Sequence, residues 1–225
     1  VSCAIPAGGV SASTKFRIRF SSDGSVNQDG VAFDDFHIYS SSVIHNTAGN
    51  LLNRTAFSSN SGNWVFVNNA SGHRIFGFLD NQNLGTVSVN VQVNNGPVRE
   101  NNGIYYLDRN WVVKPTNALV AGLPVRFYVR HQEILNLVPY SAVVKSFQQL
   151  GVNKYSGANE NFDLTDNILA PETGLFTKSG SWVPFMDGYY FETSFTSMSE
   201  FRFAESPFSD EVPLALSQIW ITGKR

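Results

Sequence analysis

The sequence predicts an all-β protein: an antiparallel β-sandwich of jelly-roll or immunoglobulin-like type, with one short inserted helix near residues 141–150. Three observations predict this fold. Apolar and polar residues alternate within short segments, and turn-forming residues separate those segments at regular spacing. The 225 residues also include 18 Phe and 23 Val, which favour strands, beside 25 Ser, 22 Asn and 18 Gly, which favour turns.

Charge and composition exclude several classes of protein. The chain has 16 Lys and Arg against 18 Asp and Glu, a net charge of -2. It therefore lacks the basic excess that neutralises phosphates, and we expect no nucleic-acid partner. Because 42% of residues are hydrophobic and only 15% charged, the chain can bury a core. No apolar run approaches the roughly 18 residues of a membrane-spanning helix, so we expect no membrane span.

The first predicted element is a hairpin over residues 15–39. Residues 15–20 (KFRIRF) alternate strictly between charged and apolar side chains, as a half-buried antiparallel strand does. A turn-rich loop leads into a second strand, which ends near Tyr39. A lone hairpin is marginally stable in water, so it needs a partner sheet. We assign residues 1–45 to the C-terminal part of a jelly-roll-like domain or to an accessory hairpin.

The loop of this hairpin is the candidate metal site. Asp23, Asp29, Asp34 and Asp35 supply the hard oxygen ligands that Ca²⁺ prefers. In the alternative interpretation, the two Asp-Gly steps of the loop form turns and bind nothing. A structural Ca²⁺ is the one cofactor that the sequence suggests.

Residues 46–206 are predicted to form the β-sandwich module itself. Residues 86–93 (TVSVNVQV) give the clearest strand, with a valine at every second position facing a core. Residues 207–225 hold Pro207 and Pro213, and we expect an exit linker with one short strand there. The other predicted strands are NWVFVN, HRIFGFLD, GIYYLDRNWVV, LPVRFYVRH, NKYSG, GLFTKSGSWVPF and GYYFETSFTSMSEFRF.

One segment departs from the two-residue period. Residues 133–150 (EILNLVPYSAVVKSFQQL) carry apolar side chains at a period near 3.6, which is typical of a helix. Pro139 divides the segment, because a helix rarely continues through proline. We therefore expect a short helical turn and then a helix from about Ser141 to Leu150, stopped by Gly151.

The search for catalytic motifs favours a protein that is not an enzyme. The sequence has no G-x-S-x-G, H-E-x-x-H, P-loop or C-x-x-C motif. Glu133 and Asp108 could act as paired carboxylates of a hydrolase, but no pattern positions them together. A hydrolase with an unfamiliar active site is the least favoured hypothesis.

Aromatic side chains give a second candidate site. Tyr106, Trp111 and Trp182 could stack on a sugar ring, or the same residues could pack in the core. Along residues 104–113, alternation places Tyr106, Asp108 and Asn110 on one face of a strand. Arg109 and Trp111 then lie on the other face.

Two stretches resemble known families. Residues 15–40 (KFRIRFSSDGSVNQDGVAFDDFHIYS) resemble the closing hairpin of MAM-like or concanavalin-like jelly rolls, with Phe36 where Val or Ile is usual. That resemblance implies a structural cation beside Asp34 and Asp35. Residues 50–205 look like a module of large secreted surface proteins of Bacteroidetes that are exported by type IX secretion. The segments that carry this likeness are NLGTVSVNVQVNNGPVRENNGIYYLDRNWVVKP, VRFYVRHQEILNL and SMSEFRFAE, followed by PLALSQIWITGKR.

The second resemblance implies an extracellular or cell-surface location and brings no catalytic residues with it. The partners it implies are neighbouring domains of the same polypeptide or other surface proteins. We therefore expect a non-catalytic extracellular β-sandwich module of a larger surface protein, acting in adhesion, spacing or assembly. The alternative is a carbohydrate-binding module attached to a secreted enzyme or adhesin, with a polysaccharide as its partner.

Overall fold

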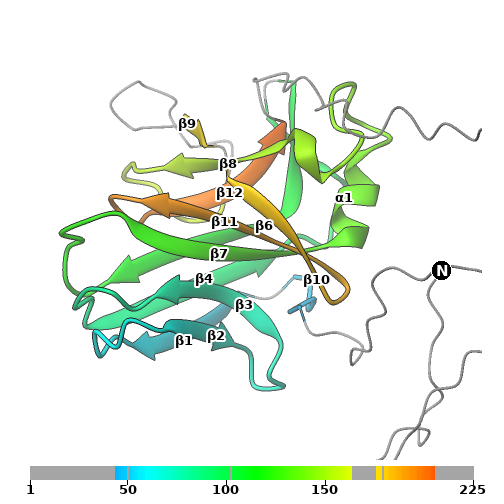
Figure 1. The fold of residues 1–225 in the computed structure, drawn as a ribbon. Helices are drawn as coiled ribbons and strands as arrows, with labels where there is room; N and C mark the ends of the chain where they lie inside the picture. The colour runs from blue at the N-terminus through cyan, green and yellow to red at the C-terminus, as the bar shows by residue number, and fades with distance from the viewer. Residues whose placement is uncertain (1–43, 50, 102, 164–175, 179, 206–225) are drawn as a thin grey trace, which may run out of the picture. The chain divides into compact units, whose positions relative to one another are not determined.

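Two antiparallel β-sheets pack against each other in the computed structural model (Figure 1). The structure describes residues 44–49, 51–101, 103–163, 176–178 and 180–205. The predicted hairpin over residues 15–39, its acidic loop and the exit linker over residues 207–225 lie outside the described residues. Within the described residues, strands predominate and one short α-helix is present. The predicted all-β sandwich is therefore confirmed.

The larger sheet has seven strands, and neighbouring strands within it run antiparallel. Six of them lie in the order β1 (Leu52–Phe57), β4 (Thr86–Val93), β6 (Ile104–Pro115), β12 (Glu200–Glu205), β8 (Leu150–Tyr155) and β9 (Phe176–Lys178). The seventh, β5 (Arg99–Asn101), pairs with the first part of β6.

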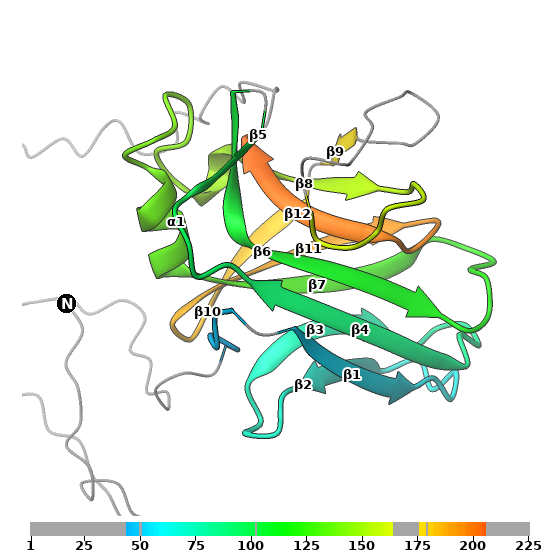
Figure 2. The same cartoon turned by 180° about the vertical axis from the view of Figure 1, so that it is seen from behind.

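The smaller sheet has five antiparallel strands. Their order is β10 (Ser181–Phe185), β11 (Gly188–Phe195), β7 (Leu123–Arg130), β3 (Arg74–Leu79) and β2 (Trp64–Asn68). Figure 2 shows the two layers from the opposite side, with β1, β4 and β6 of the larger sheet toward the viewer.

The core lies between the sheets and is rich in aromatic rings. Alternation along β4 turns Val87, Val89 and Val91 inward, and all three are at most 1% exposed. At the centre, the Phe127 ring of β7 packs against five other rings with centroid separations of 5.1 to 6.3 Å; these belong to Phe76, Trp111, Phe195, Phe201 and Phe203. Buried apolar area of this kind contributes about 25 cal/mol per Å², so this interior is the main source of stability.

The segment before β1 packs on the same sandwich. Ile44 is fully buried and forms a bridge with Arg74 of β3, and the backbone N–H of His45 donates to the Arg74 carbonyl at 2.9 Å. The boundary predicted between residues 45 and 46 thus falls inside a segment that contacts the core.

The α-helix lies before Pro139, where the sequence predicted only a short helical turn. Helix α1 (His131–Leu137) follows β7 directly and turns Glu133, Ile134 and Leu137 toward the interior. The last helical bond runs from the Val138 N–H to the Ile134 carbonyl, and Pro139 ends the helix because it has no N–H to donate.

The predicted helix over residues 141–150 is wrong. In a helix from Ser141, the backbone N–H groups of Lys145 and Ser146 would donate to the Ser141 and Ala142 carbonyls, but both donate to the Gln149 amide oxygen instead, at 2.6 and 3.1 Å. Only a 3₁₀ turn, η1 (Phe147–Gln149), follows before β8 begins at Leu150. Val144 and Leu150 are buried all the same. The apolar spacing therefore indicated burial and not helical structure.

Candidate functional site

The three aromatic residues proposed from sequence do not form one platform. Trp111 is fully buried between the sheets, where its Nε1–H donates to the Ile75 carbonyl at 2.9 Å. Trp182 of β10 packs on the rings of Phe191 and Phe203, with centroids 4.9 and 5.1 Å apart.

Tyr106 lies on the other face of β6, away from the core that holds Trp111. It is 2% exposed and packs with Ala204 and Ile104 in a separate small cluster. The guanidinium of Arg202 lies 5.3 Å from the centre of its ring. Tyr106 is therefore part of a different environment, the outer face of the larger sheet.

The aspartates proposed as metal ligands, Asp23, Asp29, Asp34 and Asp35, lie outside the described residues. In the part of the chain that the structure does describe, no three His, Cys, Asp or Glu side chains are grouped so that they could hold a metal ion.

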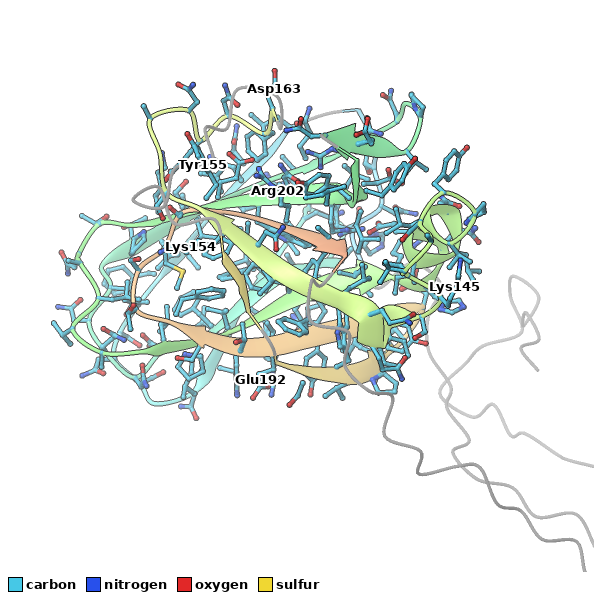
Figure 3. The ribbon with its side chains drawn as sticks, turned by 90° about the horizontal axis from the view of Figure 1, so that it is seen from above. Lys145, Lys154, Tyr155, Asp163, Glu192 and Arg202 are labelled. Carbon is cyan, nitrogen blue, oxygen red and sulfur yellow. The ribbon has the colours of Figure 1, made fainter. Side chains whose placement is uncertain are left out.

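The outer face of the larger sheet carries buried polar and charged side chains. Register pairs Arg202 of β12 with Asn110 of β6 on one side and Asn153 of β8 on the other. Glu200 lies two residues from Arg202 on the same face, and Asn110, Glu200 and Arg202 are each at most 1% exposed. In Figure 3, Arg202, Tyr155 and Asp163 lie on this side of the sandwich, opposite Glu192 of the smaller sheet. Uncovered sheet faces are normally solvated, so something must cover this one.

The loop over residues 156–163 covers it. The Glu160 carboxylate accepts from the Ser199 hydroxyl at 2.8 Å and lies 3.0 Å from the Lys114 ammonium. Ser199 also bonds the Ser156 hydroxyl at 2.8 Å. These contacts fasten the loop to β6 and to the residue that precedes β12.

One continuous hydrogen-bond network lies beneath the loop. Arg99 of β5 donates to the Asn110 amide oxygen at 2.5 Å, and the Asn110 amide donates to Glu200 at 2.8 Å. Phe162 closes the network through its backbone: its N–H donates to Glu200 at 3.4 Å, and its carbonyl accepts from Arg99 at 3.3 Å. Phe162 has a φ of 74°, a left-handed conformation that costs a non-glycine residue energy. The hydrogen bonds of its backbone to Arg99 and Glu200 stabilise Phe162 in this conformation.

Burial dominates the electrostatics of this network. It raises the pKa of Glu200, against the opposing effect of the nearby Arg202 charge. Burial and the repulsion from Arg202 lower the pKa of Arg99 to about 10, so Arg99 stays charged at neutral pH. Burial also lowers the pKa of Arg202. Its Nη1 lies 3.8 Å from Glu200, and its Nε and Nη1 have no hydrogen-bond partner. Two positive charges thus share one buried carboxylate.

A hollow of about 510 Å³ opens beside this network. A second hollow of about 360 Å³ adjoins it, because both share Pro97, Val98 and Asp108. We call the pair the β5–β6 trough. The other residues of the first hollow are Gln92, Asn94, Arg99, Glu100, Asn161, Phe162 and Asp163. The second hollow adds Gly96, Leu135, Asn136, Pro139 and Tyr140.

Asp108 forms the wall between the two hollows. Burial raises the pKa of its carboxyl group, although hydrogen bonds from the Asn94 and Asn136 amides oppose the shift. The Asn94 amide lies 3.5 Å from Asp108 and donates to the Pro97 carbonyl at 2.8 Å. One half-buried carboxylate, that of Asp108, therefore lines both hollows of the trough.

The two carboxylates considered from sequence as a catalytic pair do not face each other. Asp108 lines the outer trough, whereas the Glu133 carboxylate accepts from Arg109, the next residue of β6, on the inner face. Adjacent strand residues point to opposite sides of a sheet, which separates the two groups.

Sequence reasoning missed Arg99 and Glu200 of the network. The signal was present in residues 200–203 (EFRF), where charged residues alternate with phenylalanines. That alternation predicts charges on one face of a strand and a core on the other. It could not predict the loop that buries the charges.

Comparison with protein-family models, curated proteins and solved structures finds no match to the chain. Of the helices that the structure describes, none has the length and apolar character that a membrane crossing requires.

Proposed function

We propose that the chain is a non-catalytic extracellular β-sandwich module of a larger surface protein, acting in adhesion, spacing or assembly. The proposal that the chain is exported rests on the likeness of residues 50–205 to modules of secreted Bacteroidetes surface proteins. The partners that this role implies are neighbouring domains of the same polypeptide or other surface proteins.

One observation carries the non-catalytic part of the proposal: the charged groups around the β5–β6 trough are held by structural contacts. Glu200 accepts from Asn110 and Phe162, and Arg99 donates to Asn110 and Phe162. Hydrolysis by paired carboxylates needs two such groups about 5–10 Å apart on either side of a bond. Asp108 and Glu133, the two carboxylates considered from sequence, cannot form such a pair, since Glu133 lies on the inner face. A surface of this kind suits recognition better than catalysis.

A turnover screen tests the proposal. The purified 225-residue chain is incubated with glycosidase, esterase and peptidase substrates, and we expect no product above the buffer control. Turnover that rises with protein concentration and disappears in Asp108→Asn would overturn the non-catalytic role. Antibody labelling of intact source cells tests the location, and we expect the module at the surface. Labelling only after the cells are broken would contradict it.

A carbohydrate-binding module is the second candidate function, and the β5–β6 trough favours it. Residues with amide, carboxylate and guanidinium groups line this hollow together with Phe162. This combination offers both hydrogen-bond donors and acceptors beside an apolar surface, as small-molecule sites do.

A further inference from the structure

We infer that the β5–β6 trough binds a neutral saccharide segment, with Asp108 at the centre of the site. This inference rests on the proposed non-catalytic role and names what the module recognises. It moves the candidate ligand residues away from Trp111 and Trp182, which pack in and against the core, to the outer face of the larger sheet.

The size of the trough suits such a ligand. Its two adjoining hollows of about 510 and 360 Å³ each lie within the usual range for small-molecule sites. Because they share Pro97, Val98 and Asp108, a ligand in one hollow continues into the other past the Asp108 carboxylate. An extended ligand with repeating units fits this shape better than a single compact one.

The chemistry of the lining suits hydroxyl groups. A sugar hydroxyl both donates and accepts, so a site that reads several of them needs both kinds of partner. The Asp108 carboxylate accepts and the side-chain amide of Gln92 both donates and accepts, whereas the Arg99 guanidinium beside them already donates to Asn110 and Phe162. Internal hydrogen bonds from Asn94 and Asn136 orient Asp108 before a ligand arrives. Such preorganisation reduces the entropy lost on binding.

Two aromatic residues line the trough. Phe162 lines the first hollow, and Tyr140 lines the second, where it is 56% exposed. Flat rings pack on the C–H face of a sugar and bury apolar area there.

The charge of the trough selects a neutral ligand over an acidic one. Among the described lining residues, three carboxylates (Glu100, Asp108 and Asp163) stand against the single guanidinium of Arg99. A uronate or sulfated sugar would place further negative charge beside them, and like charges at close range repel. We therefore expect the site to reject acidic polysaccharides.

Affinity electrophoresis of the full chain tests the inference. The probes are hydroxyethyl cellulose, xylan and mannan as neutral polysaccharides, with polygalacturonate as the acidic one. Gln92→Ala, Asp108→Asn and Tyr140→Ala each remove one contact of the trough. Asn90→Ala is the matched control, because Asn90 lies on the same face of β4 as Gln92 but outside the trough. Circular dichroism of each variant verifies folding, and the exposed Tyr140 gives a variant that leaves the core untouched.

We expect at least one neutral polysaccharide to retard the chain. Gln92→Ala and Asp108→Asn should each weaken that binding about tenfold, the usual cost of one lost hydrogen bond to a charged or well-placed group. Tyr140→Ala should weaken it to a similar degree, about tenfold, because it removes the apolar ring contact. Asn90→Ala should bind normally. The inference is overturned if no neutral probe binds, if polygalacturonate binds more tightly, or if the trough variants bind as well as the wild type. Release of reducing sugar from a bound probe would instead overturn the non-catalytic role and leave the location of the site standing.

Discussion

Arg109 of β6 and Glu133 of α1 form an ion pair inside the sandwich. The Arg109 Nε donates to both carboxylate oxygens of Glu133, at 2.8 and 3.1 Å, and its Nη2 also donates to Glu133. The same Nη2 donates to the His45 carbonyl at 2.9 Å. Arg109 is fully buried, and the Glu133 side chain is 8% exposed. One guanidinium therefore ties together the larger sheet, the α-helix and the segment that precedes β1.

Neutralising one member of this pair should destabilise the fold strongly. Glu133→Gln leaves the buried Arg109 charge without its counter-charge, and removing one partner of a buried ion pair typically costs about 3–5 kcal/mol. We expect a loss of this size in the free energy of unfolding, measured by urea denaturation.

The pair of Arg126 and Glu192 provides the matched control. These side chains are 21% and 37% exposed, with Nε and Oε2 2.7 Å apart, and lie on the outer face of the smaller sheet. Solvent screens such a pair, so Glu192→Gln should cost about 1 kcal/mol or less. Equal losses in the two variants would show that burial does not set the strength of the Arg109 pair. Replacing both partners, as in Arg109→Met with Glu133→Leu, should recover much of the stability.

Acidification should destabilise the fold through His45. Burial, followed by repulsion from Arg109, lowers the pKa of His45 from 6.5 to about 4. Its Nδ1 lies 3.1 Å from the Asn69 amide nitrogen, which can only donate, so the folded state holds the neutral ring. Between these pKa values the unfolded state binds more protons. Above pH 6.5 His45 makes its full contribution to the free energy of unfolding. As the pH falls toward 4, up to about 3 kcal/mol of this stability is lost.

Urea denaturation of the wild type and His45→Gln between pH 7 and 4 measures this contribution. The difference in stability between the two proteins should shrink as the pH falls, because glutamine can accept from Asn69 but does not titrate. A difference that stays constant for His45→Gln would rule out its protonation as the cause.

The sequence predicted those strands whose alternation comes from strong apolar residues. β4 has valines on one face and Ser88, Asn90 and Gln92 on the other, and its observed bounds match the predicted ones. β1 was missed, because its sequence LNRTAF has no apolar run, and the strand forms by pairing along its length with β4. β5 was missed for a similar reason. Its three polar residues are held by β6, a pairing that no local pattern records.

The candidate site could be predicted only in part. Alternation along β6 correctly placed Tyr106, Asp108 and Asn110 on one face, opposite Arg109 and Trp111. Which face is covered depends on contacts far apart in sequence, such as that between Glu200 and the backbone of Phe162. The ion-pair partner of Arg109 could not be predicted, because it is Glu133 of helix α1, which begins directly after β7 and brings that carboxylate inward.

A hydroxyl introduced on the inner face of β4 should destabilise the sandwich. Val89→Thr keeps the shape of the side chain but buries a hydroxyl among apolar groups, since Val89 is fully buried. An unpaired buried hydroxyl costs about 1–3 kcal/mol. Thermal unfolding should show a lower melting temperature, whereas Val120→Thr, at a residue 88% exposed, should leave it unchanged. Equal melting temperatures for Val89→Thr and the wild type would contradict an apolar interior at this position.

Calcium removal tests the acidic loop predicted from sequence. If Asp23, Asp29, Asp34 and Asp35 bind a structural Ca²⁺, the ion binds the folded state and stabilises it by mass action, by about 2.7 kcal/mol at a hundredfold excess over Kd. A chelator should then lower the melting temperature, and Ca²⁺ should restore it.

Asp34→Ala distinguishes this site from the turn-forming interpretation of the same loop. The variant should melt at the lower temperature from the start and respond no further to chelator, because it has lost a ligand of the ion. A chelator response that persists in Asp34→Ala would place the ion elsewhere. The absence of any response in the wild type would leave the Asp-Gly steps as turns alone, since a turn holds its conformation without a metal ion.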